Sequence, residues 1–149
     1  MSEQPPGPEL TLRALTESAA TGFNGALGLE FEEASPERVV ARLRIGPQHL
    51  QPYGVVHGGV YASLAETVAS VGAALSAARH DPGSGAVGLE NHTTFLRTAR
   101  SGAEVVAEAL PQHAGRRTQS WRVAMRDAGD GRELAVANVR LIVVRPGSI

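Results

Sequence analysis

One carboxylate, Glu66, stands in the middle of a long apolar segment and is the side chain best placed to do chemistry. The segment from Gly59 to Ala78 reads GVYASLAETVASVGAALSAA, and Glu66 is its only charged residue. Alanine, valine and leucine occur on every face of the helix that this segment predicts, so we expect the helix to be buried nearly all round. Because an unpaired carboxylate is costly to bury, Glu66 is expected to be paired or functional, for example as a base.

A second interpretation places Glu66 on a narrow stripe of the helix that faces water. Ser63 lies three residues before Glu66 and Ser70 four residues after it, so the three polar side chains share one helix face. The pattern alone leaves open whether this stripe faces solvent or a substrate.

The segment before the helix, Val55-Val56-His57-Gly58-Gly59, has the residues needed to hold a carbonyl oxygen. Glycines let the backbone approach a ligand closely. The free N–H groups at a helix start, together with the positive end of the helix dipole, can polarise a carbonyl group. By itself His-Gly-Gly is also typical of a tight turn with a surface histidine.

The spacing between the two features limits how they can cooperate. Gly58 and Glu66 are eight residues apart, which is roughly 12 Å along one helix. A single carbonyl group cannot touch both residues of the same chain. If both serve one reaction, the active site must lie at a symmetric dimer interface.

The elements that position these residues follow from hydrophobic periodicity and turn residues. We expect an amphipathic helix over 10–20, a loop over 46–58 and the long helix over 59–78. Strands are expected over 27–34, 39–45, 86–97, 103–109, 117–125 and 134–145. This order indicates an α+β domain in which one main helix covers an antiparallel sheet. We expect a flexible tail over residues 1–8 and a single domain over 9–149.

Composition excludes several classes of function. The chain has 149 residues, a net charge of −1 and no cysteine, so disulfides, zinc–thiolate sites and a cysteine nucleophile are excluded. The five histidines, at 49, 57, 80, 92 and 113, form no metal-binding pair, and we expect neither a metal nor an organic cofactor. Neither nucleic acid nor a membrane is expected as a partner. The N-terminal segment does not resemble a signal peptide, so the expected location is cytoplasmic.

Taken together, the motifs resemble the hot-dog superfamily, and within it the PaaI-type and 4-hydroxybenzoyl-CoA thioesterases. The resemblance covers about residues 27–145. Its most specific stretch is QPYGVVHGGVYASLAE, from Gln51 to Glu66, and further matches are NHTTFLR at 91–97 and HAGRR at 113–117. It implies a long helix wrapped by an antiparallel sheet, an acyl-CoA thioesterase activity and an assembly that is at least a homodimer and typically a homotetramer.

The resemblance also implies roles for individual residues. Glu66 matches the carboxylate that attacks the thioester or activates water. Gly58 matches the residue whose backbone N–H polarises the carbonyl, with Gln51 and His57 beside it and Ser70 one turn after the carboxylate. Substrate or coenzyme A contacts are implied at Asn91, Arg97, Arg116, Arg117 and Arg145.

Two other functions remain open at this stage, an acyl-thioester dehydratase and a non-catalytic acyl-CoA-binding or sensing protein. The set of Gln51, His57-Gly58-Gly59, Glu66 and Ser70 favours the thioesterase over both. The sequence leaves the acyl group open among small, medium-chain and aromatic ones. Only 4% of the residues are aromatic, so an aromatic stacking pocket is not evident.

Overall fold

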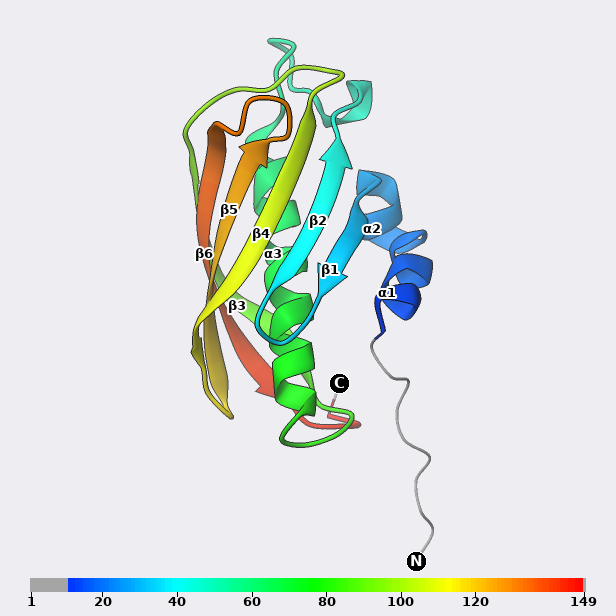
Figure 1. The fold of residues 1–149 in the computed structure, drawn as a ribbon, viewed down its shortest axis with the longest axis vertical. Coiled ribbons are helices and arrows are strands. Elements are labelled where there is room, and N and C mark those ends of the chain that lie inside the picture. The colour runs from blue at the N-terminus through cyan, green and yellow to red at the C-terminus, as the bar shows by residue number, and fades with distance from the viewer. Residues whose placement is uncertain (1–10, 149) are drawn as a thin grey trace, which may run out of the picture.

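The computed structural model describes residues 11–148, in which a six-stranded antiparallel sheet packs along one long helix (Figure 1). The strand order is β1-β2-β4-β5-β6-β3, which leaves β1 and β3 at the two edges. The helices are α1 (Leu12–Ala19), α2 (Gly22–Leu27), the 3-10 turn η1 (Pro47–His49) and α3 (Gly58–Ala78). The strands are β1 (Glu30–Ala34), β2 (Val39–Arg44), β3 (Gly85–Phe95), β4 (Glu104–Ala114), β5 (Thr118–Asp127) and β6 (Glu133–Val144).

The predicted α+β architecture, the antiparallel sheet and the single main helix are confirmed. Most boundaries agree within two residues, and two differ by more. The strand expected over 27–34 begins only at Glu30, because a second short helix, α2, occupies residues 22–27 and ends at Gly28 with a φ of 79°. Strand β4 continues to Ala114 rather than ending at Ala109. The tail expected over residues 1–8 lies outside the described residues.

Helix α3 is the core helix, but the expectation that it is buried nearly all round is wrong. Val60, Leu64 and Val68 are buried against the sheet, while a stripe that contains Ser63, Glu66, Thr67 and Ser70 is open at the protomer surface. Helix α3 is long and apolar enough, by length and composition alone, to cross a membrane. A core helix has the same composition, and just over half of the most apolar part of α3 is buried within the protein.

Close packing holds α3 to the centre of the sheet. The indole of Trp121 on β5 lies against the backbone of Gly72, where a Cβ atom would come within 2.5 Å of the ring. Trp121 Nε1 donates to Gln119 Oε1 at 2.9 Å, and Gln119 Nε2 in turn donates to the Ala73 carbonyl at 3.3 Å. The buried polar groups of Trp121 and Gln119 are therefore paired, as such groups usually are in a stable core.

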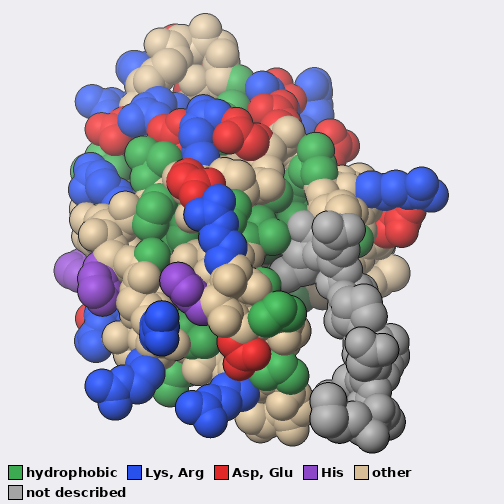
Figure 2. Space-filling model, turned by 60° about the horizontal axis from the view of Figure 1, so that its bottom comes forward, with side chains coloured by type: hydrophobic (Ala, Val, Ile, Leu, Met, Phe, Trp, Pro, Cys, Tyr) green, Lys and Arg blue, Asp and Glu red, His purple; other side chains and the backbone are tan. Residues whose placement is uncertain are grey.

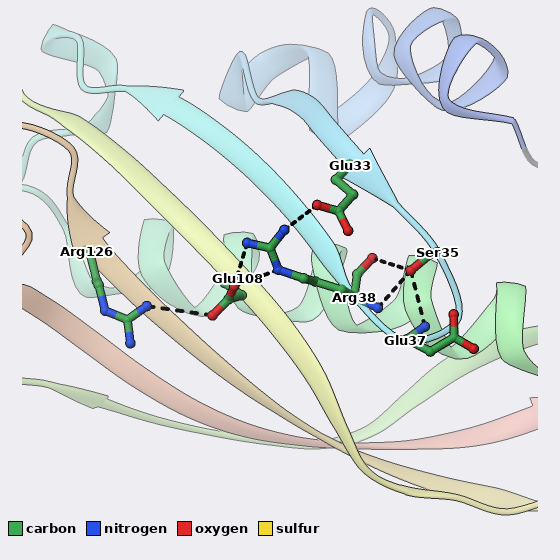
Figure 3. A network of polar contacts seen from close by, with 6 residues as sticks. All are labelled: Glu33, Ser35, Glu37, Arg38, Glu108 and Arg126. Carbon is green, nitrogen blue, oxygen red and sulfur yellow. Dashed lines mark hydrogen bonds and ion pairs between the residues drawn. The ribbon is translucent and has the colours of Figure 1, made fainter.

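The outer face of the sheet is solvated and carries a network of ion pairs (Figure 3). Arg38 contacts Glu33 and Glu108, and Arg126 lies 3.8 Å from the other oxygen of Glu108. The hydrogen bond to Glu108 is the main cause that raises the pKa of Arg38. Surface pairs of this kind contribute little to stability, but they indicate that this face of the sheet is exposed to solvent.

Strand β3 contains the irregularity that matters most for the site. Gly88 pairs with Leu141 and Glu90 with Arg140, so Leu89 is an extra, bulged residue. In a regular strand, residues three apart face opposite sides. The bulge at Leu89 instead lets both Gly88 and Asn91 face α3.

Candidate active site

Glu66 lies at the protomer surface in a shallow hollow. The hollow has a volume of about 330 Å³ and is lined by α2 and α3 through Phe23, Asn24, Ser63, Glu66, Thr67 and Ser70. The predicted grouping of Ser63 and Ser70 with Glu66 is therefore confirmed. The carboxylate is exposed in the single protomer, so only a second molecule or a substrate can withdraw it from water.

Residues of strand β3 contact the Glu66 side chain and limit its position. The Gly88 backbone lies so close that a Cβ atom there would be 2.6 Å from Glu66 Oε1. Asn91 Nδ2 donates to the Ala62 carbonyl at 2.9 Å and lies 3.5 Å from Glu66 Oε2. The Thr93 hydroxyl donates to Asn91 Oδ1 at 2.7 Å, which fixes the amide with its nitrogen toward the helix and the carboxylate. Asn91, expected as a substrate contact, is thus placed beside the Glu66 carboxylate.

The start of α3 presents an unpaired backbone donor. His57 is the N-cap of α3, and its Nδ1 accepts from the Gly59 N–H at 2.8 Å. Val60 N–H donates to the His57 carbonyl, whereas the Gly58 N–H makes no hydrogen bond within residues 11–148. Because His57 Nδ1 is an acceptor, a neutral ring carries its proton on Nε2.

Gly58 opens into a second hollow, of about 300 Å³, lined by Gln51, Val55, Val56, Gly58, Tyr61, Phe95, Leu96, Arg97 and Thr98. Gln51 Oε1 accepts from the Tyr53 N–H at 2.6 Å, which leaves the Gln51 amide nitrogen for other partners. A Cβ atom on Gly58 would lie 2.6 Å from the Phe95 ring, so only glycine fits there without a shift of the ring.

Two buried side chains, His49 and Tyr61, lie near this end of the helix. His49 Nδ1 accepts from the Gly46 N–H at 2.9 Å, and its Nε2 lies 2.6 Å from the Leu27 carbonyl. The His49 carbonyl accepts from the His57 N–H at 2.8 Å, so His49 joins the end of α2 to the loop that precedes Gly58. Tyr61 has a buried hydroxyl, and burial with the nearby Asp127 raises its pKa to about 12, so this hydroxyl stays neutral.

The hollows that contain Glu66 and Gly58 are separate on one protomer and share no lining residue. Both residues belong to α3, as the distance argument required. Next to this surface lies β3, an edge strand with exposed Val87 and Leu89. Unpaired, apolar strand edges are surfaces on which a second chain can pair.

The arginines expected to contact coenzyme A fall into two groups. Arg116, Arg117 and Arg145 share a hollow of about 430 Å³ beside the C-terminal end of α3, together with Ala77, His80, Asp81, Ser84 and Val143. Figure 2 turns this end of the molecule forward and shows basic side chains and histidines spread over it. Arg97 lies instead in the Gly58 hollow, where its Nη1 donates to the Glu133 carbonyl at 2.8 Å.

Several residues of the site are not evident from the sequence. Phe23 and Asn24 reach the Glu66 hollow on a helix that the pattern did not predict. Gly88 was missed as well, although a glycine inside a strand is a known sign of a bulge or a close backbone approach. Among residues 11–148, no group of three or more acidic, histidine or cysteine side chains is arranged to hold a metal ion.

Comparisons with known proteins agree with this geometry. The thioesterase superfamily model matches residues 53–134, which include Gly58 and Glu66. Rv1847 of Mycobacterium tuberculosis is 43% identical over 119 residues, covering 80% of this chain and 84% of that protein. The 1,4-dihydroxy-2-naphthoyl-CoA hydrolase of Escherichia coli is 31% identical over 119 residues, covering 80% and 85% of the two chains.

A solved structure extends the likeness to the whole fold. The thioesterase HI1161 of Haemophilus influenzae superposes with a TM-score of 0.81 at 31% identity, covering 91% of each chain. The predicted hot-dog fold and the predicted hydrolase activity are both confirmed. The chain belongs to the thioesterase superfamily and is a hot-dog-fold thioester hydrolase.

Proposed function

We propose that the protein is an acyl-CoA thioesterase whose active site combines Glu66 of one protomer with Gly58 of a second. One observation carries this proposal: the Gly58 N–H is unpaired within the described residues, and it lies on the same helix as Glu66 but in a different hollow. A partner protomer would explain the two hollows, because its Gly58 hollow could then face the Glu66 hollow of the first protomer.

The free edge of strand β3 is the surface on which two protomers are proposed to pair. If the β3 edges of two protomers pair antiparallel about a two-fold axis, the sheet continues across the interface and the two α3 helices lie side by side in opposite directions. The start of one helix then faces the middle of the other, where Glu66 is located. Exposed Val87 and Leu89 would be covered by the same pairing.

In the proposed reaction the Gly58 N–H donates to the thioester carbonyl oxygen. Negative charge grows on this oxygen during attack, and a fixed donor at a helix start stabilises it without rearrangement. The Gln51 amide nitrogen and the proton on His57 Nε2 are available as further donors on the same side.

Glu66 supplies the attack on the carbonyl carbon by one of two routes. As a nucleophile it forms a mixed anhydride and releases the coenzyme A thiolate, and water then hydrolyses the anhydride. As a general base it takes a proton from water, which attacks directly and transfers hydroxide to the acyl carbon. In both routes the thiolate is protonated and one water is consumed. Ser70, one turn further along α3, lines the same hollow and is proposed to orient the carboxylate or the water.

The phosphates of coenzyme A are proposed to bind the hollow that contains Arg116, Arg117 and Arg145. None of these three arginines forms an ion pair within residues 11–148. Planar guanidinium groups without an acidic partner are suited to bidentate contacts with phosphate. The hollow borders Ala77, eleven residues beyond Glu66 on α3, or roughly 16 Å along the helix. The pantetheine arm would bridge that distance.

A direct assay tests the proposal. Purified protein is mixed with acetyl-, hexanoyl- and benzoyl-CoA, and thiol release is followed with a chromogenic disulfide. We expect release of free thiol from at least one of these esters without added metal or cofactor. Binding without thiol release would favour the sensing protein instead, and hydration of crotonyl-CoA would favour the dehydratase.

A glycine substitution tests the placement of Glu66. Gly88→Ala should lower kcat by about tenfold or more, because the new Cβ would displace Glu66 Oε1, which lies 2.6 Å from that position. Gly85→Ala on the same strand is the matched control, since its Cβ would only touch Val144 at 3.5 Å. Equal kinetics for the two variants would show that Glu66 does not depend on the Gly88 backbone for its position.

A further inference from the structure

The hollow around Glu66 is formed from two elements, and the short helix α2 supplies its outer wall. Phe23 and Asn24 are consecutive residues of α2, and both line the hollow together with four residues of α3. Phe23 is 66% exposed, the most exposed phenylalanine within the described residues. An exposed aromatic ring beside a reactive carboxylate requires an explanation, because its apolar surface gains nothing from contact with water.

The position of α2 is well determined by hydrogen bonds. The Leu27 carbonyl at its C-terminal end lies 2.6 Å from Nε2 of the buried His49, and Gly28 closes the helix with its N–H donating to the Asn24 carbonyl at 2.9 Å. The Thr67 hydroxyl on α3 lies 3.3 Å from Asn24 Oδ1. These contacts fix α2 to His49 on one side and to α3 on the other. They keep Phe23 and Asn24 beside Glu66.

The two side chains offer complementary chemistry to a ligand. The Phe23 ring presents a flat apolar face, on which an aryl or alkyl group can pack. Asn24 Nδ2 makes no hydrogen bond within residues 11–148, so an N–H donor is available next to that face. The hydroxyls of Ser63 and Ser70 line the same hollow from α3. The wall formed by α2 is therefore apolar at Phe23 and offers a hydrogen-bond donor at Asn24.

We infer that α2 selects the acyl group of the substrate, with Phe23 packing against its hydrocarbon part and Asn24 donating a hydrogen bond to a polar substituent. This inference rests on the proposed thioesterase function, because it takes Glu66 as the group that meets the thioester carbon. That carbon has two substituents, the pantetheine sulfur and the acyl group. If the phosphates bind the arginine hollow at the C-terminal end of α3, as proposed above, the pantetheine arm runs toward that hollow. The acyl group is then left to the wall made by α2.

The selectivity of acyl groups follows from this arrangement. A bulky or planar acyl group covers the Phe23 ring, whereas an acetyl group is too small to reach it. Hydrophobic pockets typically discriminate by about tenfold or more between such ligands. An acyl group with a hydroxyl substituent additionally satisfies the Asn24 amide, and one neutral hydrogen bond changes affinity by about tenfold.

The test compares ratios of kcat/KM rather than single rates. Wild type, Phe23→Ala and Asn24→Ala are assayed with acetyl-CoA, benzoyl-CoA and the ortho-, meta- and para-hydroxybenzoyl-CoA esters. Phe23→Ala should lower the benzoyl-to-acetyl ratio by about tenfold, mainly through KM. Asn24→Ala should lower the ratio of the preferred hydroxybenzoyl ester to benzoyl-CoA by a similar factor. Leu12→Ala, which removes an exposed apolar side chain from α1 outside the hollow, should leave both ratios unchanged.

The outcomes separate the inference from the proposed function. If wild type hydrolyses none of the esters, the proposed function fails. If wild type is active but Phe23→Ala and Asn24→Ala change kcat/KM for all substrates by the same factor, α2 does not select the acyl group and the inference is overturned. Sedimentation of each variant completes the test, because a Phe23→Ala protein that dissociates would show that the ring belongs to a protein interface instead.

Discussion

Glu66→Gln should lower kcat by about a thousandfold while the protein remains folded. Catalysis by one positioned base or nucleophile typically contributes between 10² and 10⁴ in rate. Glutamine keeps the shape of the side chain and its contact with Gly88, but its amide can neither attack a thioester nor accept a proton from water. Because Glu66 is exposed in the protomer and forms no ion pair within residues 11–148, its replacement should not disturb the fold.

Thiol release at saturating substrate, together with thermal unfolding, measures both parts of this expectation. Glu90→Gln is the control, since Glu90 lies on the neighbouring strand, is exposed and pairs with Arg140 on the water side of the sheet. That variant should retain the wild-type kcat. If Glu66→Gln keeps more than about a tenth of the wild-type kcat, a general acid–base or nucleophilic role for the carboxylate is excluded.

The sequence predicts those parts of this molecule that depend on periodicity. The long helix is recognised from an apolar run of the right length, and strand β2 from its alternation. That Glu66 shares a helix face with Ser63 and Ser70 follows from helical spacing alone. If Glu66 and Gly58 serve one reaction, the need for a second protomer follows from one distance along one helix. In each case, the inference uses only the geometry of a regular element.

The parts that the sequence does not predict depend on irregular backbone. The burial of α3 was overestimated because small residues occur on all its faces, and composition does not show that a single protomer leaves one stripe open. The bulge at Leu89, which turns both Gly88 and Asn91 toward the helix, has no periodic signal. Helix α2 has only six residues and contains two glycines, so its position depends on tertiary contacts such as His49 with Leu27 rather than on propensity.

Removal of the Gly58 N–H should have the second large effect, and a proline can remove it with little change to the backbone. Proline is favoured at the first position of a helix, which Gly58 occupies. His57, with φ −69° and ψ 134°, already has the conformation that a residue before proline requires. Since the ring would collide with Phe95, the variant is Gly58→Pro in a Phe95→Ala background, compared with Phe95→Ala alone. We expect kcat to fall by about 10²–10³, the usual effect of losing one oxyanion donor.

Combining the two defects decides whether the site is shared between protomers. A heterodimer of one Glu66→Gln chain and one Phe95→Ala/Gly58→Pro chain contains one site with both defects and one site with neither, if Glu66 and Gly58 meet across the interface. The purified heterodimer should therefore recover about half of the wild-type activity per dimer, although each parent homodimer is nearly inactive. A site formed within single protomers carries one defect in every copy, and its heterodimer stays inactive. Recovery would thus require that the carboxylate and the N–H come from different chains, as we propose from their separation along α3.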